Sequence, residues 1–179
     1  MHSEKGSGAR QEALEGRLSH VEEEYGRERA KMVDVGEKPV EARSALARAR
    51  VRFPEGLLGK ILDGKGPKGA MPAIQEMARA AGCLGAKKTG ELIPLCHPLG
   101  LDHVDVTFEE VEADVLEVLC RSACRGRTGV EMEALVGASL AALTVYDMTK
   151  ALDPAIRIEA VELLEKRGGK RGLWQTDRD

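Results

Sequence analysis

The feature that most constrains the fold is a long apolar segment of small residues that ends at Asp153-Pro154. Residues 131–152 have a helical pattern, and a proline disfavours helical backbone in the residue before it, so we expect a helix that stops there. A helix that is apolar on all sides is buried by its neighbours. The middle of this helix carries Gly137, Ala138, Ser139, Ala141 and Ala142. We therefore expect close packing on several sides.

Alternating apolar residues predict three strands near this helix. The first two are joined by an acidic turn and indicate a hairpin, and the third follows the helix. Their apolar positions are Val104, Val106 and Phe108, then Val115, Val118 and Cys120, then Ile156, Ile158 and Val161.

Three further helices are expected before the hairpin, over residues 39–50, 56–62 and 72–86. Pro39 suits the first turn of a helix, and the apolar residues of each segment recur at helical spacing. Strands separated by helices, together with a hairpin, predict an α+β fold of two layers, with an antiparallel sheet packed against helices.

The two ends of the chain are expected to lie outside this domain. Residues 10–31 have a narrow apolar row at helical spacing, which predicts a helix in an N-terminal extension, residues 1–31. The domain is expected over residues 32–172, with a flexible basic run from Lys166 to Gly172. Residues 173–179 are expected to form a flexible tail.

Composition limits the classes of function. The chain has 179 residues and a formal net charge of −3, which argues against a globally basic nucleic-acid binder. Its five aromatic residues argue against base stacking on single strands. No apolar run is long enough to span a membrane, and no secretory signal is seen at the start. Four cysteines without such a signal are expected to be thiols, which favours a cytoplasmic location.

The segment Lys88–Leu99 has neither helical nor strand periodicity, although it is apolar and contains two prolines. Such a loop is typical of a pocket wall that presents Cys96 and His97. These two residues are either a reactive pair, or a buried thiol beside a histidine that bonds to backbone. A zinc-dependent binding module is a third possibility, with Cys120 and Cys124 as further ligands, although no Cys-x2-Cys pair is present.

Charged residues on the long helix form two groups. Glu131 and Glu133 suit the start of a helix for electrostatic reasons. Asp147 and Lys150 are three residues apart and face each other on a helix that we expect to be buried, so the pair is either a structural ion pair or a functional one. Lys68 lies in a Gly-Pro-Lys-Gly turn, from which a lysine can reach an anion.

The spacing of these groups has a geometric consequence. If residues 131–150 form one straight helix, Glu133 and Asp147 are about 21 Å apart along it, at about 1.5 Å per residue. One small substrate does not easily reach both. Either the helix begins after Glu133, or the site combines residues from two subunits.

Three segments, taken in order, resemble the cyclic pyranopterin monophosphate synthase family of molybdenum cofactor biosynthesis: Lys88–Leu99, Thr128–Leu135 and Thr144–Ala151. The likeness begins at Met32 and ends near Gly172. It implies a ferredoxin-like α+β fold and a homohexamer built as a trimer of dimers. It also implies a lyase that converts (8S)-3′,8-cyclo-7,8-dihydroguanosine 5′-triphosphate to cyclic pyranopterin monophosphate and diphosphate.

The same resemblance implies the roles of individual residues. Asp147 matches the active-site position, and Lys150 and Lys68 match lysines that act with it. The expected substrate-binding residues are Leu95, Cys96, His97, Glu131, Met132, Glu133, Arg43, Lys166 and Lys170. No metal site and no required cofactor are expected, although Mg²⁺ can accompany the triphosphate. Ala70 stands where the family usually has an aspartate, so a nucleotide-binding protein without catalytic activity is the alternative.

Overall fold

The N-terminal part of the chain contains a small hairpin. The computed structural model describes residues 19–64 and 71–176, and the chain divides into two compact units, Met1–Asp34 and Val35–Asp179. In the first unit, strands β1 (Val21–Glu24) and β2 (Arg27–Ala30) pair antiparallel. Their connecting residues, Tyr25 and Gly26, both have positive φ, at 54° and 73°, as a tight type I′ hairpin turn requires. The helix predicted for residues 10–31 is therefore wrong over residues 19–31, and its earlier part lies outside the described residues.

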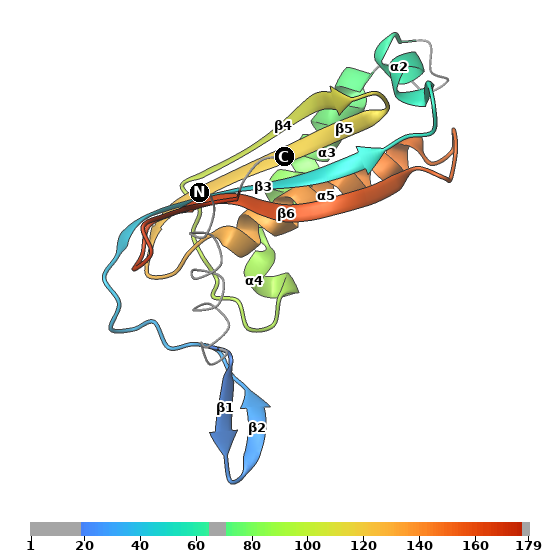
Figure 1. The fold of residues 1–179 in the computed structure, drawn as a ribbon. Helices are drawn as coiled ribbons and strands as arrows, with labels where there is room; N and C mark the ends of the chain where they lie inside the picture. The colour runs from blue at the N-terminus through green and yellow to red at the C-terminus, as the bar shows by residue number, and fades with distance from the viewer. Residues whose placement is uncertain (1–18, 65–70, 177–179) are drawn as a thin grey trace, which may run out of the picture. The chain divides into compact units, whose positions relative to one another are not determined.

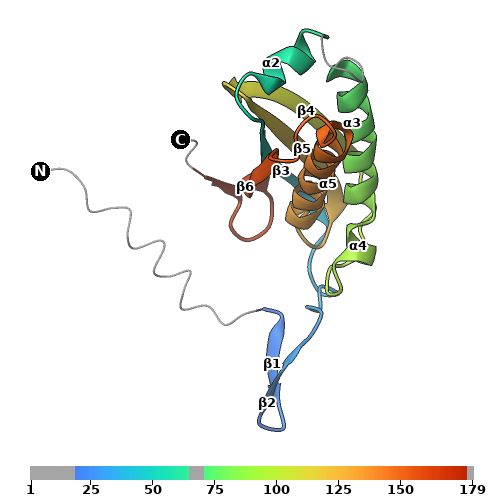
Figure 2. The ribbon, with the colours of Figure 1, turned by 90° about the vertical axis from the view of Figure 1, so that its right-hand side faces the viewer.

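The second unit is a five-stranded antiparallel sheet with helices on one face (Figures 1 and 2). The strand order is β4-β5-β3-β6-β7, and the four long strands with α3 and α5 give the βαββαβ arrangement of a ferredoxin-like α+β fold. The fold class predicted from the sequence is thus confirmed. The elements are β3 (Glu41–Arg52), α2 (Leu57–Leu62), α3 (Met71–Lys87), α4 (Thr89–Leu92), β4 (His103–Glu112), β5 (Val115–Gly126), α5 (Glu131–Thr149), β6 (Arg157–Arg167) and β7 (Leu173–Gln175).

The central strand β3 occupies the segment for which a helix was predicted, and that prediction is wrong. Alanine and arginine are good helix formers, which favoured the helix. From Ala47 onward the segment nevertheless alternates between buried apolar residues and arginines, and Ala45, Ala47, Ala49 and Val51 are all buried against the helices. Pairing along its length with β5 and β6 satisfies its backbone groups on both sides. Tertiary pairing has overridden local propensity.

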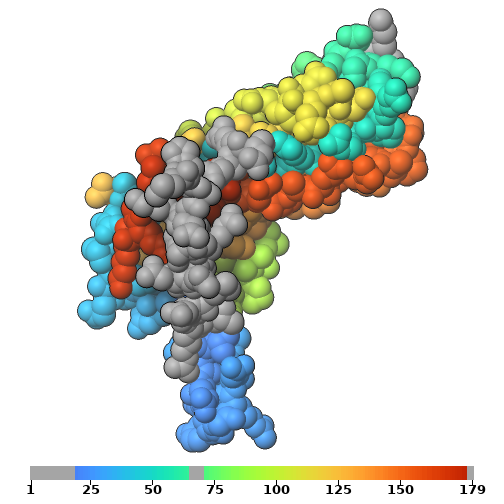
Figure 3. All heavy atoms as spheres, viewed as in Figure 1, coloured from blue at the N-terminus to red at the C-terminus, as the bar shows by residue number. Residues whose placement is uncertain are grey.

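The opposite face of β3 carries arginines that neighbouring glutamates neutralise. Arg48 pairs with Glu162 on β6 at 3.0 Å, and Arg50 pairs with Glu117 on β5 at 3.1 Å. Figure 3 shows β3 at the surface between the β4–β5 hairpin and β6 on this side of the sheet. Cross-strand pairs of opposite charge stabilise a sheet. Ion pairs therefore stabilise this face of β3, whereas apolar packing stabilises the face toward the helices.

The C-terminal region is more regular than the sequence predicted. Lys166 and Arg167 belong to β6, and Leu173–Gln175 form the edge strand β7, where a flexible run and tail were expected. The turn between the two strands is closed by backbone hydrogen bonds from Gly168 to Gly172 and from Gly172 to Gly169, both 3.0 Å. This turn becomes one wall of the site described below.

Helix α5 packs closely on two sides, as its small residues predicted. Ala138, Ala141 and Ala142 are fully buried, and a Cβ atom at Gly137 would lie 2.5 Å from the sulfur of Cys120 on β5 and 3.2 Å from the carbonyl oxygen of Gly82 on α3. The prediction of a long helix buried between other elements is confirmed. Within the described residues, no helix combines the length and the apolar content needed to cross a membrane.

We expect Gly137→Ala to destabilise the domain, although alanine favours helices by about 1 kcal/mol over glycine. The added methyl group has no space between α5, α3 and β5, and overpacking a core costs about 1–3 kcal/mol. The matched control is Gly59→Ala in the exposed helix α2, where a Cβ atom meets nothing within 4 Å. Chemical denaturation should show a lower unfolding free energy for the first variant and an equal or higher one for the second.

Candidate active site

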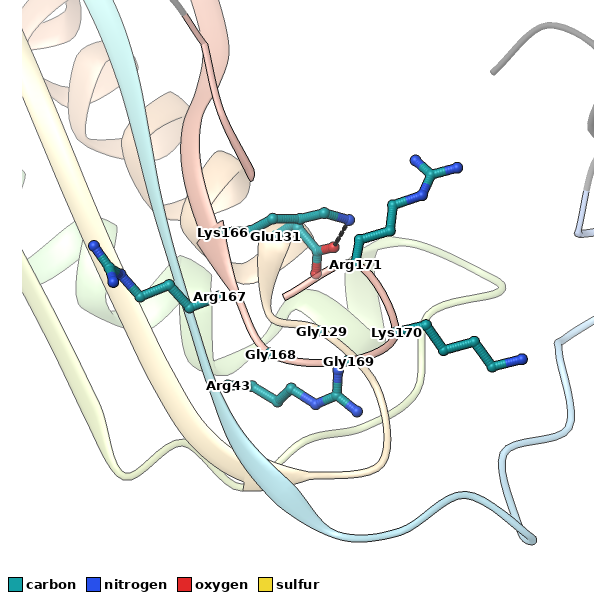
Figure 4. A pocket seen from close by; sticks show the side chains of 9 residues that line it. All are labelled: Arg43, Gly129, Glu131, Lys166, Arg167, Gly168, Gly169, Lys170 and Arg171. Carbon is teal, nitrogen blue, oxygen red and sulfur yellow. Dashed lines mark hydrogen bonds and ion pairs between the residues drawn. The ribbon is translucent and has the colours of Figure 1, made fainter. Parts of the chain in front are cut away.

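A basic cavity lies where the start of α5 meets the end of β6. Its volume is about 140 Å³, and Figure 4 shows the side chains around it. They come from the start of β3, the loop before α5, the end of β6 and the turn that follows. The lining residues are Arg43, Gly129, Glu131, Lys166, Arg167, Gly168, Gly169, Lys170 and Arg171.

Two glycines shape the wall of this cavity. Gly168 and Gly169 have φ angles of 97° and 76°, in the left-handed region that side chains disfavour. A Cβ atom at Gly168 would lie 2.5 Å from the carbonyl oxygen of Ala42, and one at Gly169 would lie 2.2 Å from a guanidinium nitrogen of Arg43. The turn therefore packs directly against β3 and the arginine side chain, and no other residue type fits either position without rearrangement.

Positive charge dominates the cavity. Five of its lining residues are basic, and Glu131 is the one acidic residue among them. Glu131 accepts a hydrogen bond from the Nζ atom of Lys166 at 2.7 Å. Its carboxylate folds back over Gly129, where a Cβ atom would be 1.8 Å away. The excess of cations makes the cavity suited to a polyanionic ligand.

Glu133, two residues further along α5, borders a second cavity of about 120 Å³. Its side chain is buried, and burial first, followed by the negative charge of Glu131, raises its pKa from 4.5 to about 6. The other lining residues come from the end of α3, α4 and the loop that follows: Ala86, Lys87, Gly90, Glu91, Pro98 and Leu99.

The segment Lys88–Leu99 contributes Gly90, Glu91, Pro98 and Leu99 to the wall of this second cavity, but Cys96 and His97, which it was predicted to present, are not among the residues that line it. It contains the one-turn helix α4, and Gly90 of that helix lies so close to Pro98 that a Cβ atom would be 2.9 Å from the proline Cα. Cys96 is half-buried, and its pKa is raised by burial and by the charge of Glu133. The structure thus brings the Cys96 loop to the start of α5, with Leu95 and His97 half-buried beside it.

Asp147 and Lys150 lie at the other end of α5. The Nζ atom of Lys150 donates to Asp147 at 2.5 Å, and this hydrogen bond raises the pKa of the lysine. The pair was predicted to be partly buried, and this is wrong: the side chains are 68% exposed for Asp147 and 54% for Lys150. The continuous helix from Glu131 to Thr149 also excludes a start after Glu133, so about 21 Å of helix separates Glu133 from Asp147.

The cysteines do not form a zinc site with His97. Cys120 is fully buried between β5 and α5, where burial raises its pKa to about 12. Cys124 is also buried, and its pKa is raised first by this burial and then by the negative charge of Glu133. Within residues 19–64 and 71–176, no three or more His, Cys, Asp or Glu side chains come together as a metal-binding group. The four cysteines are free thiols.

Three of the predicted residues remain to be placed. Met132 is 37% exposed on α5 between the two glutamates, and Lys170, in the turn after β6, lines the basic cavity although its side chain points away from Arg43 and Lys166 (Figure 4). Lys68 lies outside the described residues. The sequence did not single out Lys87 and Glu91 in the second cavity, or Arg167 and Arg171 in the first. The double glycine beside Lys166 and Lys170 was the available signal for the last two.

The amino-acid sequence of this domain is similar to those of known proteins. The model of the MoaC family matches residues 32–169. A protein of Chloroflexus aurantiacus called cyclic pyranopterin monophosphate synthase is 51% identical over 150 residues, which cover 83% of this chain and 90% of that protein. One of the same name from Novosphingobium aromaticivorans is 53% identical over 147 residues, covering 82% and 91%.

A third relative, cyclic pyranopterin monophosphate synthase 1 of Mycobacterium tuberculosis, is 49% identical over 158 residues, covering 88% of this chain and 89% of that protein. The chain belongs to the MoaC family. The resemblance inferred from the three sequence segments is thereby confirmed.

The buried carboxyl of Glu133 predicts a pH dependence of stability. Because its folded pKa of about 6 exceeds the ordinary 4.5, the folded protein binds this proton more tightly than the unfolded chain does. The resulting stabilisation is complete below about pH 4.5 and is lost as the pH rises through about 6. Relative to Glu133→Gln, the unfolding free energy of the native protein should fall by about 2 kcal/mol across this range. Denaturation curves at several pH values test this, and a constant difference would contradict it.

Proposed function

We propose that this chain is a cyclic pyranopterin monophosphate synthase, a lyase of molybdenum cofactor biosynthesis. It converts (8S)-3′,8-cyclo-7,8-dihydroguanosine 5′-triphosphate to cyclic pyranopterin monophosphate and diphosphate. The observation that carries the proposal is the near 50% identity to relatives of that name over more than four fifths of the chain. The basic cavity supports it, because a triphosphate is the kind of ligand that a lining with Arg43, Lys166, Lys170 and Arg171 attracts, even though Arg167 points away and pairs with Glu165.

The reaction makes two demands on the site. Forming a cyclic phosphate requires a sugar hydroxyl oxygen to attack the α-phosphorus while the bond from phosphorus to the diphosphate oxygen breaks. The hydroxyl loses a proton, and negative charge grows on the leaving diphosphate, which Arg43, Lys166 and Lys170 would offset. Rearranging the guanine-derived ring requires proton transfers, for which Asp147 beside Lys150 is a coupled acid and base.

We propose further that the catalytic site is shared between copies of the chain. Asp147 lies about 21 Å along α5 from Glu133, and Lys150 lies further still, so one chain does not bring them to the same substrate as the basic cavity. A second copy that presents its Asp147 to the cavity of the first would complete the site. This supports a homo-oligomer, which we propose is a homohexamer built as a trimer of dimers.

The remaining assignments follow from this site. Leu95, Cys96, His97, Met132 and Glu133 would contact the guanine-derived part of the substrate, and Lys68 would act with Asp147. Glu131 would orient Lys166 through its 2.7 Å hydrogen bond. We propose that the protein supplies no metal site of its own and that any Mg²⁺ enters on the triphosphate. A reducing cytoplasm suits four free thiols.

We expect Asp147→Asn and Lys150→Ala each to reduce turnover of the cyclised guanosine triphosphate by about 100-fold or more, as the loss of an acid or base group does. Both side chains are mostly exposed, so neither change should lower the melting temperature noticeably. A matched control is Glu76→Gln, which removes the charge of an exposed carboxylate from another i, i+3 pair, with Arg79. A fall in melting temperature without loss of turnover would show that the pair is structural.

Subunit mixing tests the shared site. Asp147→Ala and His97→Ala are each expected to be inactive because each damages a different half of the same site. If the halves come from different chains, exchanging subunits between the two variants will create some intact sites, and activity will reappear. Light scattering verifies the assembly, and native mass spectrometry of variants that carry tags of different mass verifies the exchange. A fully active monomer, or no recovery after verified exchange, would place the whole site within one chain.

A further inference from the structure

Glu41 bridges two walls of the basic cavity. It is the first residue of β3 and is not among the described residues that line the cavity. Its Oε2 atom accepts a hydrogen bond from the backbone N–H of Gly169 at 3.0 Å and pairs with the Nη2 atom of Arg43 at 3.4 Å. The pairing of β3 with β6 ends at Ser44 and Arg167. Beyond that point the Glu41 side chain links the two segments.

Arg43 is held tightly between this carboxylate and the glycine turn. Its side chain is only 10% exposed, and Gly169 lies so close that a Cβ atom there would be 2.2 Å from Nη1. The Nε atom is buried and has no hydrogen-bond partner among the described residues. Because a guanidinium is planar and rigid, fixing Nη2 also fixes the direction of Nε. A buried donor without a partner is costly unless a ligand supplies the acceptor.

We propose that Glu41 is a positioning residue for phosphate recognition, an inference that rests on the function proposed above. Its carboxylate fixes the Arg43 guanidinium and the turn at Gly169, so that Arg43 Nε is already oriented when a phosphate group of the substrate enters beside Lys166 and Lys170. Preorganised donors bind more tightly because less ordering is needed on binding.

The sign of the effect separates this role from simple electrostatics. A carboxylate near an anion site repels the anion, so removing its charge alone should tighten phosphate binding. A positioning role gives the opposite result, because the freed guanidinium loses its orientation and the turn loses a hydrogen bond. The direction of the change in affinity therefore decides between the two.

Inorganic diphosphate is the probe, and titration calorimetry on the full-length protein is the measurement. For Glu41→Ala we expect the Kd for diphosphate to rise about tenfold, as loss of charge-assisted orientation predicts. Glu41→Gln keeps an oxygen that can accept from Gly169 but loses the charge, so its Kd should lie between those of the native protein and Glu41→Ala. Glu109→Ala removes an equal charge from the exposed side of β4 and should leave the Kd unchanged.

A double-mutant cycle shows whether Glu41 acts through Arg43. In an Arg43→Ala background, Glu41→Ala should change the Kd by less than about twofold, because its target is absent. The native KM for the cyclised guanosine triphosphate should rise with the Kd in Glu41→Ala, whereas a purely structural role would lower the melting temperature alone. If Glu41→Ala does not fold, Glu41→Gln carries the comparison.

Three outcomes would overturn the proposal: unchanged or tighter diphosphate binding by Glu41→Ala, an equal effect in the Arg43→Ala background, or no diphosphate binding by the native protein. Failure of the proposed function would appear differently. In that case the native protein would bind diphosphate in a Glu41-dependent way and would not turn over the cyclised guanosine triphosphate.

Discussion

The close approach of α5 to the sheet and to α3 is the constraint on which the rest of this domain depends. Side chains on both surfaces are small: Ala45, Ala47 and Ala49 on β3, and Gly137 on α5 with Gly82 opposite it on α3. Protein interiors are packed about as densely as organic crystals, so such a contact has few alternative arrangements. It fixes where α5 starts, beside the end of β6, and therefore where the basic cavity forms.

Elements with a clear local pattern were predicted from the sequence, including the strands β4, β5 and β6 as well as the helices, whereas β3 and the β1–β2 hairpin were not. The α3 and α5 segments have long helical patterns and were found with nearly correct bounds. β3 was mistaken for a helix because its alanines and arginines favour helices locally, while its burial depends on partners some 70 to 120 residues further along the chain, such as Glu117 and Glu162. The β1–β2 hairpin was missed because the first residue of its turn, Tyr25, has a positive φ that residues other than glycine, asparagine and aspartate rarely adopt.

The candidate site shows the same division. The three recognised segments brought Cys96, Glu133 and Asp147 to attention, yet no sequence pattern shows that Glu133 is buried while Asp147 is exposed. Solvent exposure depends on what the rest of the fold covers, and the end of α3, α4 and the loop that follows lie beside Glu133 at the start of α5. The bridge from Glu41 to Gly169 joins residues 128 positions apart, a relation that only the assembled sheet creates.

The exposure of Asp147 and Lys150 has a chemical consequence. An acid and a base that face water are screened and are paired only weakly, whereas proton transfer to a bound substrate is helped by a site from which water is excluded. The isolated domain does not exclude water at that end of α5. Meanwhile the opposite end has the cations, the buried carboxyl of Glu133 and the half-buried Cys96 loop. Under the proposed function, the end of α5 with Asp147 and Lys150 lacks the groups that bind substrate, and the start of α5 lacks an acid–base pair. A rigid helix cannot bend to join the two ends. Contact between the start of α5 in one copy and the end of α5 in another would both complete the set of groups and remove the acid–base pair from water.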